Sequence, residues 1–503
     1  MINSTLNSYI IFITMFKDLR AKQSFTIASI TFWSQFAVYS FQAILILYLT
    51  RSVKRYGLGF DESQAYAFQG ASHAMMYAVV MLGGFMADRY LGLRRAILLG
   101  SLLLAFSFLL IFISGFFVES SRYFFIAAYA LIPAASSLLL GTSSGLVSKI
   151  YSDDPLNAKS AMTTYYISIN VGSILAFSLA PWLMQYEFGP LTVLLIVFVG
   201  KLISAVNFLY RYKMYDNVVE EIDKNKMPFR SKMIVISYLV VIYITTLLAY
   251  SAPNIANMSI LFFSIVCLFA FLFYTMTLDG HVRIKQIVGL ILIVVAVVFF
   301  VVYNQMNSTM VLLAQNNSDL MMFGVHINAA AYQLVNPFVI ILGGLLLVLI
   351  YPYFPRFCIP YQFAVGILLS SVGMYVVYFG LNESSNGIIS GNYLVWSYIL
   401  VSISELFVSA IGLSMIGSYC NIKTIGLAMG AWYISNALSS SITGLLNQVV
   451  SLPSKGATIL KSAHMYKIYF LNTSIVVLLI GCIVCVLAYA LVRYMKSKEV
   501  SFI

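Results

Sequence analysis

The residues best suited to chemistry in this sequence are the few polar and charged ones that interrupt long apolar stretches. Glu405, Asn170 and Lys201 each lie inside such a stretch. A charged or amide side chain at membrane depth costs free energy unless it has a partner, so each is a functional candidate. A carboxylate in an apolar cavity favours its protonated form and can exchange a proton in the physiological range. Glu405 is therefore the strongest candidate for a group that binds and releases a proton, and, if the chain is a proton-coupled transporter, for the coupling residue.

Structural alternatives exist for the other two. Lys201 is a possible cavity charge, and the alternative is that it extends toward an interface or pairs with a backbone carbonyl. Asn170 alternatively joins two helices through a hydrogen bond. With 4 His in the chain, we find no metal-ligand spacing, no Ser/His/Asp constellation and no Walker motif. The sequence therefore predicts neither an enzyme nor a cofactor or metal site.

The elements that position these residues are membrane-spanning helices. The chain has 503 residues, of which 61% are hydrophobic and 9% charged, and its mean hydropathy is +0.92. That composition excludes a soluble globular or disordered protein. Apolar stretches of about 20 residues recur, as in helical membrane proteins. The predicted spans are 24–50, 62–87, 94–116, 122–149, 159–182, 188–211, 232–251, 256–277, 285–313, 329–351, 360–381, 391–419, 423–450 and 467–493.

There are about fourteen of these spans. The polar stretch 211–232 follows the first six, and we interpret the next two as an insertion before the last six. We predict an N-terminal six-helix bundle over 1–211, a linker with two inserted helices over 212–284, and a C-terminal six-helix bundle over 285–503. Placing the N-terminus inside gives the cytoplasmic segments roughly three times as many Lys and Arg residues as the outer ones. We therefore predict cytoplasmic termini, and attribute the net charge of +12 to topology rather than to nucleic-acid binding.

The loop after the second span carries the first family signature. It reads GGFMADRYLGLRR and includes Gly84, Asp88, Arg89 and Gly92. Glycines let helices approach closely, and charges at a helix end can pair with a neighbouring helix terminus. This loop resembles the cytoplasmic gating motif of major-facilitator transporters, in the form found in the proton-coupled oligopeptide transporter (POT) family.

Other motifs along the chain resemble the same family. They are Tyr165-Tyr166-Ile167-Ser168-Ile169-Asn170-Val171-Gly172-Ser173, Tyr303-Asn304-Gln305-Met306, Gln333-Leu334-Val335-Asn336-Pro337, Ser404-Glu405-Leu406 and Met429-Gly430-Ala431-Trp432. The resemblance implies a major-facilitator fold, and it implies that Asn170, Asn336 and Glu405 bind the amino terminus of a peptide. It also identifies Tyr39, Tyr77, Asn304 and Trp432 as substrate-binding candidates.

The chain departs from the family where charges are expected. The family's E-x-x-E-R-F motif aligns with Thr31, Ser34, Gln35 and Phe36, and later cations or acids align with Gln42, Leu140 and Asn304. Removing one member of a buried charge network is costly, whereas replacing all of it with neutral groups can be nearly free. The pattern suggests a redesigned cavity in which a substrate amine keeps its partner and a substrate carboxylate loses its own.

We predict a multi-pass symporter of the inner (plasma) membrane that carries di-/tripeptides or related amine-bearing molecules by alternating access. Its partners are the substrate, protons and the lipid bilayer. The alternative is a transporter of the same fold for a non-peptide metabolite or amino acid, with altered or lost proton coupling.

Overall fold

The computed structural model describes residues 18–117, 121–350, 353, 357–421, 425–451 and 458–499. Thirteen helical stretches in this part of the chain are long and apolar enough to cross a membrane, which confirms the all-helical membrane class. The remaining predicted span, 423–450, corresponds to α20 (Ile425–Leu446). Its serines lower its hydropathy, but it is a helix of membrane-crossing length.

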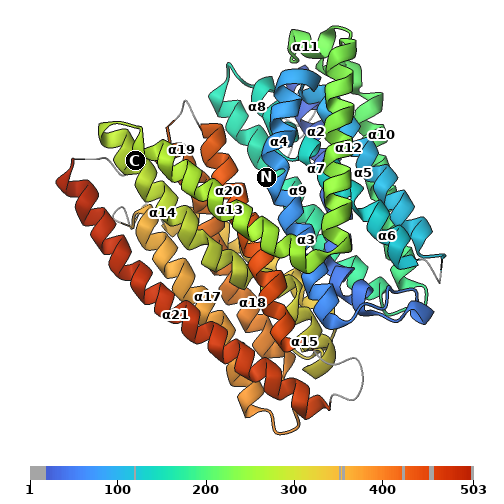
Figure 1. Cartoon of the computed structure of the whole chain (residues 1–503), viewed down its shortest axis with the longest axis vertical. Helices are drawn as coiled ribbons and strands as arrows, with labels where there is room; N and C mark the ends of the chain where they lie inside the picture. Colours follow the sequence, from blue (N-terminus) through green and yellow to red (C-terminus); the bar gives the residue numbers. More distant parts are fainter. Residues whose placement is uncertain are drawn as a thin grey trace, which may run out of the picture. The chain divides into compact units, whose positions relative to one another are not determined.

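Figure 1 shows the chain coloured in sequence order, with many of its helices labelled. The first elements are α2 (Leu19–Thr50), η1 (Val53–Arg55), α3 (Glu62–Ala78), α4 (Val80–Met86), η2 (Ala87–Leu91), α5 (Leu93–Ser114), α6 (Ser121–Tyr129), α7 (Leu131–Leu139), α8 (Thr142–Ile150), α9 (Pro155–Leu183), α10 (Gly189–Tyr210), η3 (Tyr212–Tyr215), α11 (Glu221–Lys224), α12 (Phe229–Ser251) and α13 (Pro253–Met276).

The later elements are α14 (Gly280–Tyr303), η4 (Asn304–Asn307), α15 (Thr309–Asn317), β1 (Met321–Met322), β2 (Val325–His326), η5 (Ala329–Leu334), α16 (Val335–Ile350), α17 (Ile359–Glu383), α18 (Gly391–Glu405), η7 (Leu406–Ala410), α19 (Ile411–Tyr419), α20, η9 (Asn447–Val450) and α21 (Ile459–Ser497). The two strands pair antiparallel as a small hairpin.

Several predicted spans are broken at their functional motifs. η2 and η7 are π-helical, and they follow α4 and α18 directly. α14 gives way to the 3₁₀ turn η4 at Asn304. The carbonyl groups near that break are satisfied by side chains, since Tyr398 donates to Met306 O at 2.6 Å and Gln69 donates to Asn307 O at 2.9 Å. Such satisfaction is what permits a broken helix at membrane depth.

Contacts divide the chain into two compact units. The first combines the residues up to Phe41 with Leu82–Ala176 and Leu191–Leu247, and the second combines Gln42–Met81, Phe177–Pro190 and the residues from Leu248 onward. Long helices such as α2 and α9 contribute a segment to each unit.

In the first unit, small residues let α9 and α10 approach α2. A Cβ added to Gly172 would lie 2.9 Å from Phe32 O, and one added to Gly200 would lie 3.3 Å from the Cβ of Ala37. Close backbone approach at small residues is a usual mode of helix packing in membranes. The Asn170 motif of α9 is thereby held beside the segment of α2 where the family's charges are replaced.

In the second unit, α17 packs along α21, and α3 packs against α13 and α20. Two glycines let α3 and α20 approach closely, because a Cβ on Gly70 would lie 2.4 Å from the Cα of Gly444. Asn257 of α13 donates to Ala67 O of α3 at 2.9 Å. The second unit therefore includes α3 together with the helices of the chain's later half.

Candidate functional site

An acid and an amide meet in the second unit where two helices are interrupted. Glu405 is the last residue of α18 and immediately precedes the π-helical turn η7. Its carboxylate accepts a hydrogen bond from Asn336 Nδ2 at 2.7 Å, and Asn336 also donates to Ser402 Oγ at 3.0 Å. π-bulges inside α-helices frequently occur at functional sites.

Tyr303 completes the hydrogen bonds of Glu405. It is the last residue of α14, and its hydroxyl donates to the same carboxylate. The ion pairs within the described residues all join other groups, so Glu405 has hydrogen-bond donors but no cation beside it. A half-buried carboxylate arranged in this way can accept an ammonium group or a proton.

One of two stacked tyrosines lies within electrostatic range of this centre. Tyr77 of α3 stacks on Tyr433 of α20, with ring centroids 6.4 Å apart and an interplanar angle of 14°. Tyr77 is also within electrostatic range of Glu405. Of the predicted binding residues, the structure therefore brings Tyr77, Asn336 and Glu405 together.

Asn304 and Trp432 lie in other surroundings of the same unit. Asn304 faces α20, where its Nδ2 makes long contacts of 3.5 Å with Ser440 Oγ and Thr443 Oγ1. Trp432 is 3% exposed and packs edge-on against Phe300. A Cβ on Gly412 would lie 2.0 Å from the Trp432 ring, so glycine leaves the space that the indole fills.

The remaining predicted binding residues belong to the first unit. Asn170 is 7% exposed and donates to Tyr166 O at 2.9 Å within its own helix. Tyr39 lies half-buried on α2. Lys201 is 1% exposed, and its ammonium donates to Ser34 Oγ at 2.6 Å. Its partner therefore occupies the second acidic position of the family's first-helix motif.

The predicted gating loop adopts an unusual conformation. Asp88 and Arg89 are exposed and lie in the π-helical turn η2, while Gly84 has no other side chain near its Cβ position. Gly92 follows with φ +82° and ψ 153°, a backbone conformation that essentially only glycine adopts. The loop then enters α5 at Leu93.

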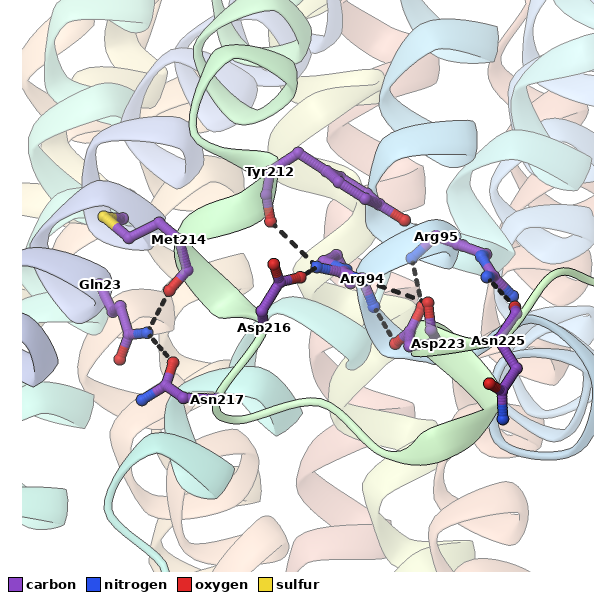
Figure 2. A network of polar contacts seen from close by, with 9 residues as sticks. All are labelled: Gln23, Arg94, Arg95, Tyr212, Met214, Asp216, Asn217, Asp223 and Asn225. Atoms are coloured by element: carbon purple, nitrogen blue, oxygen red, sulfur yellow. Dashed lines mark hydrogen bonds and ion pairs between the residues drawn. The ribbon is translucent and has the colours of Figure 1, made fainter.

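Asp223 of the polar loop caps the start of α5 (Figure 2). Its carboxylate accepts backbone hydrogen bonds from Arg94 N at 3.0 Å and Arg95 N at 3.2 Å. A carboxylate at a helix N-terminus satisfies free N–H groups and complements the helix dipole. Burial raises the pKa of Asp223, and these two N–H donors oppose the rise.

Both arginine side chains hold the same loop. Arg94 is 4% exposed, pairs with Asp216, and lies over the Tyr212 ring at 4.2 Å. Arg95 donates to Ile222 O at 2.7 Å. The stretch predicted as a polar linker is therefore folded against the N-terminal helices over at least 212–225, as Figure 2 shows.

Three contributors to these sites were not predicted: Tyr303, Tyr433 and Asp223. Tyr303 and Tyr433 are adjacent in sequence to Asn304 and Trp432, so the family motifs indicate the right segments but not which residue contacts Glu405 or Tyr77. Only the arrangement of η4 and α20 distinguishes the neighbours. Nothing in the sequence distinguishes Asp223 from the other charged residues of its loop.

Membrane-length helices that are interrupted at an acid–amide centre are the architecture of a secondary transporter. The comparisons identify the family. The model described as the POT family matches residues 94–463, and the chain belongs to this family of proton-coupled oligopeptide transporters. The resemblance carried by the sequence motifs is thereby confirmed.

Similar sequences cover nearly the whole chain. A dipeptide and tripeptide permease A of Chromobacterium violaceum is 30% identical over 469 residues, which is 93% of this chain and 93% of that protein. The protein of the same name from Yersinia pestis is 31% identical over 480 residues, covering 94% and 93%.

Solved structures have the same fold. A bacterial homologue of the human drug peptide transporters PepT1 and PepT2 aligns with TM-score 0.79 and 26% identity over 95% of this chain and 99% of that one. Tetrameric PepTSo2 aligns with TM-score 0.81 and 26% identity, with the same coverage.

Proposed function

We propose that this protein carries dipeptides, tripeptides or related amine-bearing molecules across a bacterial inner membrane by proton-coupled alternating access. The permease names of its relatives support the substrate class. The observation that carries the proposal is the Glu405 carboxylate, which has hydrogen-bond donors on two sides and no cationic partner among the described residues. The amino group of a peptide supplies the missing cation.

In this proposal Glu405 has two roles. As a carboxylate it binds the substrate ammonium group, while Asn336 and Tyr303 hold its oxygen atoms in position. In its protonated form it carries the coupled proton, because an apolar setting favours the neutral form of an acid. Tyr77, Asn304 and Trp432 are the proposed contacts for the rest of the substrate in the second unit, and Asn170 and Tyr39 are those in the first.

We propose that the two predicted six-helix bundles move relative to one another during transport. Residues 1–211 and 285–503 are the proposed moving bundles, and 212–284 are the linker with its inserted helices. Gly84, Asp88, Arg89 and Gly92 are the proposed gating residues. The excess of basic residues in the predicted inner segments supports cytoplasmic termini. Lys201 as a cavity charge stays a prediction, since its side chain is buried against α2 here.

The test is uptake of labelled dialanine into proteoliposomes, with and without an inward proton gradient. We expect accumulation above the external concentration only with the gradient, and loss of accumulation when an ionophore collapses it. Equal uptake in both conditions would refute proton coupling. No uptake of any dipeptide would refute the substrate class and favour the alternative of a non-peptide metabolite, which the names of the relatives do not support.

A further inference from the structure

A polar cavity of about 460 Å³ lies in the second unit, and Glu405 and Asn336 are not among its lining residues. It is bordered by the end of α2, the loop after α9, the end of α15 and the start of η5. Its lining includes Thr50, Arg51, Arg55, Gln185, Gln315 and Asn328. The lining residues include two cations and several neutral hydrogen-bonding groups, and none of them is an acid.

Arg51 is held in place at the wall of this cavity by its outer nitrogen atoms. Nη1 donates to Met184 O at 3.0 Å, and Nη2 makes a long contact with Tyr186 O at 3.5 Å. Its Nε is buried and has no hydrogen-bond partner in the described part of the chain. A planar guanidinium in a fixed position is suited to binding a carboxylate.

The two arginines leave positive charge without compensation. None of the ion pairs in the described residues involves Arg51 or Arg55. Burial lowers the pKa of Arg51, and the nearby Arg55 charge lowers it further. Both groups nevertheless remain cationic, because arginine does not lose its proton in proteins. An anion bound between them would relieve the repulsion.

We propose that this cavity binds the carboxylate end of the peptide substrate in a vestibule separate from the Glu405 centre. The inference rests on the proposed function for the identity of the substrate. Its size suits a small ligand, since ligand pockets are roughly 300–1,000 Å³. It also answers a chemical need, because the positions of the family's carboxylate clamp hold neutral residues, Gln35 and Leu140 among them.

The chain offers a matched pair of variants for the test. Arg55 and Lys54 are neighbours in the turn η1 and both are exposed, but only Arg55 lines the cavity. Arg55→Gln and Lys54→Gln therefore remove the same charge from nearly the same place. Arg51→Gln is a second test variant, although it also releases the loop that Arg51 holds.

Binding is measured by thermal shift of the purified protein, since a ligand raises the unfolding temperature with its occupancy. The probes are N-acetyl-dialanine, its C-terminal amide and acetate. We expect Arg55→Gln to weaken binding of N-acetyl-dialanine roughly tenfold, as for loss of one charge-assisted hydrogen bond. The amide should bind wild type and Arg55→Gln alike, and Lys54→Gln should match wild type with every probe.

The outcomes separate this site from the proposed function. Dialanine uptake with the same KM in wild type, Arg55→Gln and Lys54→Gln, and a thermal shift indifferent to the carboxylate, would overturn the vestibule and leave peptide transport standing. Carboxylate binding that depends on Arg55 in a protein that takes up no peptide would support the carboxylate site and overturn the proposed function. Acetate that stabilises as strongly as N-acetyl-dialanine would overturn a site for peptides.

Discussion

Replacing Gly92 with alanine should detach the polar loop from α5. The residue has φ +82° and ψ 153°, and a Cβ would lie 2.3 Å from Asp223 Cγ. Forcing a non-glycine residue into such a backbone region costs roughly 1–3 kcal/mol. Displacing the Asp223 carboxylate removes a helix cap worth about 0.5–2 kcal/mol. We expect Gly92→Ala to lower the free energy of unfolding by the sum of the two, roughly 1.5–5 kcal/mol.

Three further variants separate these contributions. Gly141→Ala is the control for backbone strain, because Gly141 also has positive φ, +86°, and no neighbour near its Cβ position. Asp223→Ala removes only the cap, through its bonds to Arg94 N and Arg95 N. The double variant Gly92→Ala/Asp223→Ala should be about as stable as Gly92→Ala alone, because the alanine has already displaced the carboxylate.

The assay is thermal unfolding of the purified protein in detergent, used as a ranking of the four variants. Gly92→Ala should unfold at a lower temperature than Gly141→Ala, and the double variant should show little additional loss. Cleavage of the 212–225 loop by added protease should increase in parallel. Equal effects of Gly92→Ala and Gly141→Ala, together with an additive double variant, would refute the capping role of Asp223.

Three other predictions concern separate parts of the structure. Lys201→Met should leave stability nearly unchanged, whereas Ser34→Ala, which strands the buried ammonium, should lower the free energy of unfolding by about 1–3 kcal/mol; the reverse order in thermal unfolding would contradict this reading. Gly412→Ala should displace the Trp432 ring from the space beside Gly412 and change its fluorescence, whereas Gly417→Ala should not, because a Cβ at Gly417 has no neighbouring atom within 4 Å. Identical spectra for the two variants would contradict this packing role of Gly412. Hydrogen bonding from Arg20 holds the pKa of Asp153 below its ordinary value. The pair therefore stabilises the fold at pH values above the pKa of Asp153 in the unfolded chain, and this stabilisation is lost as the pH falls through its lower pKa in the folded protein. Asp153→Asn should reduce that loss of stability at acid pH in unfolding scans, and an unchanged pH profile would contradict the assignment.

The sequence predicts the helices well because hydrophobic length is a strong signal. The span predicted over 188–211 is α10, Gly189–Tyr210. The sequence does not predict where helices are interrupted, because nothing in a continuous apolar run indicates the turns at Asn304 or after Glu405. The interruption at Asn304 leaves Tyr303, not Asn304, beside Glu405. The stacking of Tyr433 on Tyr77 joins α20 to α3 and is likewise not indicated by an apolar run.

The same limit applies to the loop after the sixth helix. The many charged residues of this loop predict that it lies in the cytoplasm. They do not indicate which of its residues bond to the N-terminal helices. Asp223 became recognisable as a cap only when the fold placed it against Gly92 and the first N–H groups of α5. By contrast, the Glu405–Asn336 pair was predicted from family motifs and lies within hydrogen-bond distance here.

The most direct test of the central claim is dialanine uptake by Glu405→Gln, with Glu383→Gln as the control because Glu383 is an exposed acid at the end of α17. N-acetyl-dialanine serves as the competitor that lacks an amine. We predict that wild type and Glu383→Gln take up dialanine and are inhibited weakly by the acetylated peptide, and that Glu405→Gln takes up no dialanine. Gradient-driven uptake by Glu405→Gln that the acetylated peptide inhibits as weakly as in wild type would contradict the account.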